Sequence, residues 1–275
     1  RLLHQTHLTE LEETRVQVNG ILRFAIVAAV TTATACAAPV AMAATKASPA
    51  DTAVQAAAKR GRYAIVTFYK QNDAASKNML EEAKKLKATY SSRADFVIAD
   101  AGNAVHKDFL AKYTADRAPM PLTLVIAPNG AVTAGYPNAI GKTDISEAFV
   151  SNGMADVLKV LQNGNLAAVC VQSSKTIYNQ NCVALAEGLR TGGQFRGALE
   201  VVKLDLADSR EAQLVQTFKI DPKTEKAQLV VIAPPGRILG TFEGVTTVGA
   251  VSAFLVSKLS GGTCGAGGGG GCCPK

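Results

Sequence analysis

The sequence predicts an α/β protein of two tandem domains, each with a mixed central sheet flanked by helices. The first observation is a duplication, because VIAP stands at 125–128 and again at 231–234. Two further pairs of similar segments precede these copies, YAIVTFYK (63–70) with LAAVCVQS (166–173) and ADFVIADAG (94–102) with ALEVVKLDLAD (198–208). The separation of about 105 residues is far longer than a solenoid repeat and fits a duplicated domain. The second observation is that apolar, strand-like runs alternate with amphipathic helical stretches in both copies.

The elements of the first copy follow from apolar periodicity and turn residues. Residues 44–61 are rich in alanine and predict a linker or an entry helix. Residues 63–69 form an apolar, β-branched run that predicts a buried strand. Asp73 is a good N-cap, and apolar residues recur at helical spacing behind it. The remaining predicted elements are a strand at 96–99, a helix at 105–113, strands at 122–127 and 131–136 around Pro128-Asn129-Gly130, and a helix at 144–161.

The second copy repeats this order. Its predicted elements are strands at 167–172, 199–204, 228–233 and 237–242, and helices at 181–190, 209–218 and 246–259. The first two strands of each copy are joined by a helix and should pair in parallel, and the last two should form an antiparallel hairpin. Gly164 ends the first copy, so we place the two domains at 62–163 and 164–260.

Composition limits the classes of function. Hydrophobic residues make up 48% of the 275 residues, which is typical of a folding chain. The net charge of +7 is spread along the chain, and basic residues do not cluster with aromatic ones, which argues against nucleic-acid binding. His106 is the single histidine after residue 43, on a stretch that we expect to be a polar helix face. A Ser-His-Asp triad or a histidine metal site is therefore not expected.

Residues 1–43 are similar to an export leader. Arg23 precedes an apolar run at 24–30, and Ala41-Met42-Ala43 offers small residues for cleavage before Ala44. We therefore expect a bacterial protein exported to the periplasm or cell envelope. Cys36 is an alternative site of lipid attachment, and through it the chain would be anchored to a membrane.

Residues 261–275 read GGTCGAGGGGGCCPK and predict a flexible tail, because no core can form from that composition. Cys264, Cys272 and Cys273 are candidate thiolate ligands for a metal. Adjacent cysteines on a glycine tether are poorly preorganised, so tail disulfides or free thiols remain alternatives.

The first copy resembles the thioredoxin family over about residues 58–162. In that family the first buried strand runs into a short loop, and Cys-x-x-Cys then opens a long helix. Here Asp73 stands at the first cysteine position and Ser76 at the second. The family also places a cis-proline directly before the third strand, which Met120-Pro121 matches. The resemblance implies a groove formed by these four residues, and a cis bond before Pro121.

The second copy resembles the family less closely, over about residues 165–260. Asn179 stands near the first cysteine position and Cys182 near the second, after a loop about two residues longer. The proline position reads Glu225-Lys226-Ala227-Gln228, without a proline. This departure argues against a family-like groove in the second copy.

Thiol–disulfide exchange needs an attacking thiolate and a second thiol to resolve the mixed disulfide. An aspartate and a serine cannot supply either, so the first copy is expected to be redox-inactive. Cys182 is the one candidate catalytic thiol inside a domain; the alternatives are a buried apolar role or a disulfide with Cys170. We predict that Cys182 is largely buried, with Cys170 packed nearby or bridged to it, and that burial raises its pKa.

Taken together, these features favour an exported thioredoxin-like protein that lacks the redox motif and acts as a scaffold for an unidentified protein or peptide. No cofactor is expected, and a role as an enzyme is not favoured. Two alternatives stay open, a thiol–disulfide oxidoreductase that uses Cys182 or the tail cysteines, and metal or thiol binding by the tail.

Overall fold

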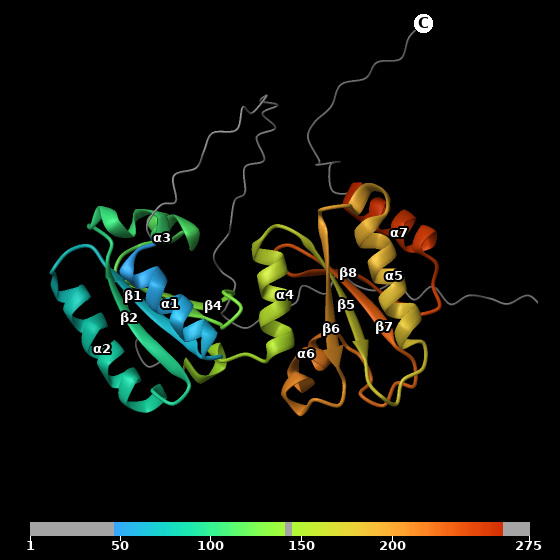
Figure 1. Cartoon of the computed structure of the whole chain (residues 1–275), viewed down its shortest axis with the longest axis horizontal. Helices are drawn as coiled ribbons and strands as arrows, with labels where there is room; N and C mark the ends of the chain where they lie inside the picture. The colour runs from blue at the N-terminus through green and yellow to red at the C-terminus, as the bar shows by residue number, and fades with distance from the viewer. Residues whose placement is uncertain (1–46, 141–144, 261–275) are drawn as a thin grey trace, which may run out of the picture. The chain divides into compact units, whose positions relative to one another are not determined.

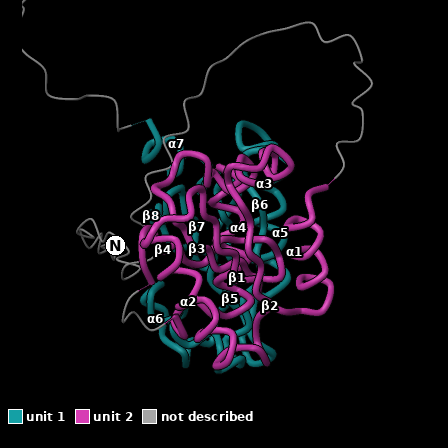
Figure 2. The backbone as a smooth tube through the Cα atoms, turned by 90° about the vertical axis from the view of Figure 1, so that its left-hand side faces the viewer, with its two compact units in different colours: residues 1–16, 165–275 teal, residues 17–164 magenta. Residues whose placement is uncertain are grey.

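The computed structural model describes residues 47–140 and 145–260. The chain divides into two compact units between Gly164 and Asn165 (Figures 1 and 2). Each unit holds its own four-stranded sheet, and no strand is shared across the boundary. The predicted tandem duplication is therefore confirmed. We call the units domain 1 (described residues 47–164) and domain 2 (165–260).

Domain 1 has the predicted order of elements. They are α1 (Pro49–Lys59), β1 (Tyr63–Tyr69), α2 (Ala74–Tyr90), β2 (Ala94–Asp100), α3 (Lys107–Lys112), β3 (Leu122–Ile126), β4 (Val132–Pro137) and α4 (Asn152–Gln162). The strand order is β2-β1-β3-β4. As predicted, β1 pairs with β2 in parallel and β3 forms an antiparallel hairpin with β4. The structure adds that β3 also runs antiparallel to β1.

The core of domain 1 lies on both faces of this sheet because β1 alternates its side chains between them. Val66 and Phe68 pack with α1 and α3 on one face. Ile65 packs on the other face with Met79 of α2 and with Phe149. The central strands are thus covered on both sides, which explains their continuous apolar sequence.

Two predictions for domain 1 need correction. The helix predicted at 144–161 is interrupted: a 3-10 turn covers Ile145–Ala148, and Ser151 then caps α4 by accepting the Met154 N–H at 3.2 Å. The helix predicted at 105–113 begins as a 3-10 turn, Ala104–His106, whose tighter winding changes the direction of its side chains. As a result His106 is only 8% exposed rather than on a polar surface.

Domain 2 repeats the architecture with β5 (Leu166–Gln172), α5 (Asn179–Thr191), β6 (Leu199–Asp205), α6 (Ala212–Thr217), β7 (Gln228–Ala233), β8 (Arg237–Glu243) and α7 (Val248–Ser260). Its strand order is β6-β5-β7-β8, with the same directions of pairing. Helices α5 and α7 cover one face of the sheet (Figure 1), where Leu189, Val251 and Leu255 are buried together with both domain cysteines. Within the described residues, no helix is long and apolar enough to cross a membrane.

Candidate functional site

Asp73 and Ser76 stand where the first turn of α2 begins. Asp73 is the N-cap, and its carboxylate accepts the Ser76 backbone N–H at 2.8 Å. This bond and the Ser76 hydroxyl hold the pKa of the exposed Asp73 carboxyl below its ordinary value. Ser76 itself is buried. The two positions matched to redox cysteines therefore form a helix cap, which satisfies backbone donors and carries no thiol.

Met120 and Pro121 lie at the same end of the sheet. The peptide bond between them is cis, as predicted. Leu122 pairs with Phe68 near the end of β1. The chain then leads from the end of β1, at Tyr69, to the start of α2. Pro121 is buried and Met120 is half-buried. The structure thus brings the four residues of the predicted groove, Asp73, Ser76, Met120 and Pro121, to one end of the domain 1 sheet. We call this end the Met120 edge.

The backbone at this edge has unpaired polar groups. Among the described residues, nothing hydrogen-bonds to the N–H or C=O of Met120 or to the C=O of Pro119. The next carbonyl, that of Pro121, accepts the Asn138 N–H at 2.7 Å. An unpaired donor and two unpaired acceptors next to a sheet are a template for pairing with another extended segment.

In domain 2 Lys226 is the counterpart of Met120. Gln228 begins β7 and pairs with Val171, as Leu122 begins β3 and pairs with Phe68. Met120 therefore stands two residues before β3 begins, and Lys226 stands two residues before β7 begins.

The edge around Lys226 is occupied by the chain itself. Ile177 forms a parallel bridge with Lys226, donating its N–H to Glu225 O at 2.8 Å and accepting the Ala227 N–H at 3.0 Å. The Thr224 hydroxyl reaches both Lys226 O (3.2 Å) and Lys226 N (3.4 Å). In domain 2 the backbone at this position is therefore paired within the chain, by Ile177 at the two neighbours of Lys226 and by the Thr224 hydroxyl at Lys226 itself. The longer loop before α5 supplies Ile177, and that extra length was the one sequence signal for this pairing.

Asn179 and Cys182 stand in the first turns of α5. Asn179 is the first residue of the helix, and its amide group donates to Ser173 O at 2.7 Å while accepting from the Thr176 hydroxyl at 2.6 Å. Asn179 therefore fixes the loop before the helix. Cys182 points into the core and is 0% exposed.

Cys170 of β5 lies next to Cys182, and both are reduced and fully buried. The Cys170 thiol donates to the Cys182 carbonyl oxygen at 3.4 Å, and the two cysteine side chains also shift each other's pKa. The hydrogen bond with Cys182, together with burial, raises the pKa of Cys170. The same bond lowers the pKa of Cys182, against the burial that raises it. The burial of Cys182 is as predicted. Its pKa, however, is lowered by the neighbouring Cys170, whereas burial alone was expected to raise it.

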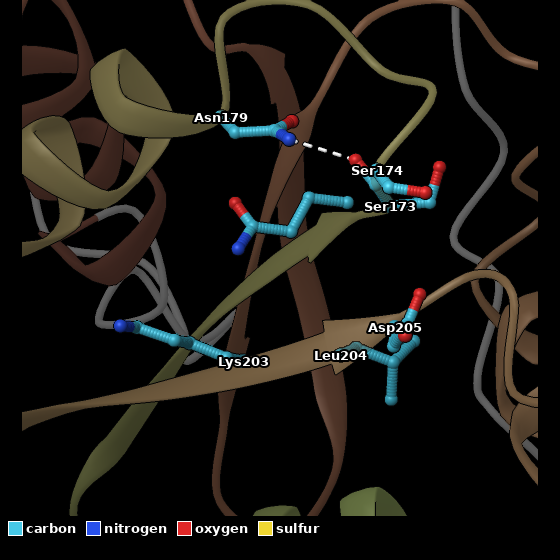
Figure 3. Close-up of a pocket in the computed structure, with 7 residues that line it drawn as sticks. Ser173, Ser174, Asn179, Lys203, Leu204 and Asp205 are labelled. Atoms are coloured by element: carbon cyan, nitrogen blue, oxygen red, sulfur yellow. Dashed lines mark hydrogen bonds between the residues drawn. The ribbon is translucent and has the colours of Figure 1, made fainter.

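A pocket of about 320 Å³ opens at the carboxyl ends of the parallel strands β5 and β6, beside the start of α5 (Figure 3). Most of the residues that line it are of polar type, although their side-chain stems supply apolar surface as well: Gln172, Ser173, Ser174, Asn179, Lys203, Leu204 and Asp205. In Figure 3 the Asn179 side chain points toward the Ser173–Ser174 turn, and Lys203 extends from β6. No sequence pattern indicated this pocket, because strands distant in the chain form it.

The other candidate residues cannot be placed. Cys36, the proposed cleavage site before Ala44, and the tail residues Cys264, Cys272 and Cys273 lie outside the described residues. Within residues 47–140 and 145–260, no group of three or more His, Cys, Asp or Glu side chains could hold a metal ion.

Comparisons with known proteins give structural likeness only. No family model and no curated protein matches the chain. Trxlp from Edwardsiella tarda EIB202 is 20% identical, with 38% of this chain and 93% of that chain covered and a TM-score of 0.30. The NTD_N/C domain of alkylhydroperoxide reductase AhpF from Enterococcus faecalis is 11% identical, covering 73% and 95%, with a TM-score of 0.28. The first two thioredoxin domains of Naumovozyma dairenensis Eps1p are 9% identical, covering 72% and 92%, with a TM-score of 0.27.

Likeness at this level carries no information on activity, and the fold is assigned from the strands themselves. In both domains a β-α-β unit with parallel strands precedes a β-hairpin, and the hairpin's first strand runs antiparallel to its two neighbours. The chain therefore consists of two tandem thioredoxin-like domains.

Proposed function

We propose that this protein is a non-catalytic, thioredoxin-like scaffold that binds an extended polypeptide at the Met120 edge of domain 1. The observation that carries the proposal is the unpaired backbone of Met120, set against the fully paired backbone of Lys226. The cap formed by Asp73 and Ser76 supports it further, because neither side chain can attack a disulfide.

Binding would proceed by strand addition. The N–H and C=O of Met120 would pair with the backbone of the incoming segment, which gives affinity without a requirement for one sequence. The Met120 side chain is half-buried and flexible, and a thioether adapts to differently shaped apolar side chains. The partner class is therefore an unfolded or extended segment with apolar side chains. Domain 2 is not expected to bind, because the Thr224 hydroxyl already pairs with the N–H and C=O of Lys226.

A suitable probe is a permanently unfolded model protein whose cysteines have been alkylated, because mixed disulfides cannot then be mistaken for binding. We expect Met120→Pro, which removes the N–H, to abolish binding. Met120→Ala, which keeps the N–H, should weaken it only modestly. Lys226→Ala in domain 2 is the matched control and should leave the affinity unchanged. Equal affinity of Met120→Pro and the unaltered protein, with both folded by thermal unfolding, would refute the proposal.

We also propose that the protein is exported. The support is the apolar run at 24–30 followed by Ala41-Met42-Ala43. Cleavage before Ala44 would leave α1 intact, since this helix begins at Pro49. N-terminal sequencing of the protein from the cell envelope tests this: a mature chain that starts at Ala44 supports export, and a lipid on Cys36 supports the anchored alternative. An uncleaved chain in the cytoplasm contradicts both.

A further inference from the structure

We propose that Cys170 and Cys182 of domain 2 are a peroxide-reactive thiol pair that closes to an intramolecular disulfide. The proposal concerns a stoichiometric modification of domain 2 and does not depend on peptide binding in domain 1. It starts from three observations: the Cys170 thiol donates to the Cys182 carbonyl oxygen at 3.4 Å within one buried cluster, a pocket opens where β5 ends, and a buried acceptor in the wall of that pocket has no partner among the described residues.

The pair lies near the margin of the core. Cys170 is two residues from Gln172, where β5 ends, and Cys182 follows the start of α5 at Asn179. Gln172 and Asn179 both line the pocket. Lys203, which also lines it, is the register partner of Cys170 on the neighbouring parallel strand, so the two side chains project on the same face. Gln172, two residues after Cys170, and Asn179, three residues before Cys182, therefore connect the buried pair to the pocket along β5 and α5.

The size and polarity of the wall favour a peroxide over a larger oxidant. Both thiols are 0% exposed, so a bulky disulfide cannot reach either sulfur, whereas a molecule near the size of water can enter through small fluctuations. The Oε1 atom of Gln172 is buried and has no partner among the described residues, so it can accept an O–H from hydrogen peroxide. Lys203 supplies a positive charge that partly offsets the raised pKa of Cys170, the thiol that attacks in the second step.

The chemistry balances with hydrogen peroxide as the sole oxidant. Cys182, near the helix N-terminus and hydrogen-bonded to Cys170, is the attacking thiolate. Its sulfur bonds to one peroxide oxygen as the O–O bond breaks, and the departing hydroxide takes up the proton that Cys182 released on becoming a thiolate, which gives water. The Cys170 sulfur then attacks the sulfenic acid, the S–O bond breaks, and a second water leaves with the Cys170 proton. Two thiols and one peroxide thus give one disulfide and two waters.

The test uses the full chain with Cys36, Cys264, Cys272 and Cys273 changed to Ser, so that the pair holds the only remaining thiols. The folded protein is treated with hydrogen peroxide, unfolded, alkylated with iodoacetamide and digested. We expect both cysteines to escape alkylation together and to appear in one cross-linked peptide that is two hydrogens lighter and is restored by dithiothreitol. In the Cys170→Ala variant, Cys182 should instead be trapped as a sulfenic acid when the peroxide-treated protein is unfolded in the presence of dimedone.

Matched variants test whether hydrogen peroxide reaches the two cysteines through the pocket. Lys203→Met and Gln172→Leu should slow bridging several-fold, whereas Lys258→Met, which removes the same charge from α7, should not. Continued alkylation of both cysteines after peroxide treatment, or oxidation of one cysteine without a cross-link, would overturn the proposal. Disulfide formation at an unchanged rate in both Lys203→Met and Gln172→Leu would show that the peroxide does not enter through the pocket.

Discussion

The Asp73 carboxylate accepts the Ser76 backbone N–H at 2.8 Å across the first turn of α2. The two positions where a thioredoxin-like redox protein would carry cysteines are thus linked by a helix cap. A carboxylate at a helix N-terminus is stabilising, because it satisfies an orphan N–H and complements the helix dipole. The site has kept a structural role for the start of the helix and has no group that could exchange disulfides.

The first prediction concerns this cap. Asp73→Ala should destabilise domain 1 at neutral pH, while Asp73→Asn should change little, because asparagine is also a good N-cap. The pKa of Asp73 is lowered in the folded state, so its contribution is present above the ordinary Asp pKa and is lost as the pH falls. The gap in melting temperature between the unaltered protein and Asp73→Ala should therefore shrink in acid. A constant gap would show that the carboxylate charge is unimportant.

The second prediction concerns Thr67 and Thr123, whose buried hydroxyl groups lie 3.0 Å apart between β1 and β3. Replacing either residue with valine leaves the other hydroxyl without this partner, which should reduce the free energy of unfolding by about 1–2 kcal/mol. The double variant should lose far less than the sum of the two, because no hydroxyl is then left behind. Urea unfolding of the four proteins measures the coupling. Strict additivity would mean that the bond contributes nothing.

A third prediction follows from Tyr63, whose hydroxyl donates to Val150 O at 2.7 Å. Burial raises the pKa of Tyr63 to about 12, although the charge of Arg93 opposes this. Tyr63→Phe should therefore lower the free energy of unfolding by about 1 kcal/mol near neutral pH. Because the folded pKa is raised, the Tyr63 contribution is full below pH 10.0 and declines as the pH rises toward 12. The difference between the two proteins should narrow over that range, and a difference that widens would contradict the assignment.

The fourth prediction compares two glycines of domain 2. A Cβ at Gly244 would lie 2.9 Å from Tyr178 O and 3.2 Å from the Cys182 Cβ, so Gly244→Ala should destabilise the domain by about 1–3 kcal/mol. A Cβ at Gly249, in the first turn of α7, would meet nothing within 4 Å. Gly249→Ala is the matched control and should be neutral or stabilising by about 0.5 kcal/mol. Similar urea midpoints for the two variants would mean that the close approach at Gly244 is not maintained in solution.

Sequence reasoning succeeded where the signal was local. The bounds of β1 were predicted correctly because Tyr63–Tyr69 is a short apolar run buried on both faces. The cap at Asp73 depends on a few consecutive residues. The break before α4 was missed because the apolar pattern runs across Ser151, and only the hydrogen bond to Met154 N reveals the new helix start.

The features that distinguish the two domains could not be predicted, because they depend on residues far apart in the chain. Ile177 pairs with Lys226 across a long separation, and the longer loop before α5 indicates extra chain there without indicating where it pairs. The open edge at Met120 is likewise visible only once the surrounding hydrogen bonds are assigned. The contact between Cys170 and Cys182 was anticipated as one of two alternatives, and the structure selects packing without a bridge.

The central claim is that the Met120 edge binds an extended segment while the Lys226 edge does not. The most direct measurement is amide hydrogen exchange at Met120 and Lys226, with and without a saturating amount of the cysteine-alkylated unfolded polypeptide. We expect exchange at the Met120 amide to slow strongly on binding, because its unpaired N–H gains an acceptor, while exchange at Lys226 stays unchanged. Binding that leaves the Met120 amide exchanging at its free rate would contradict the account.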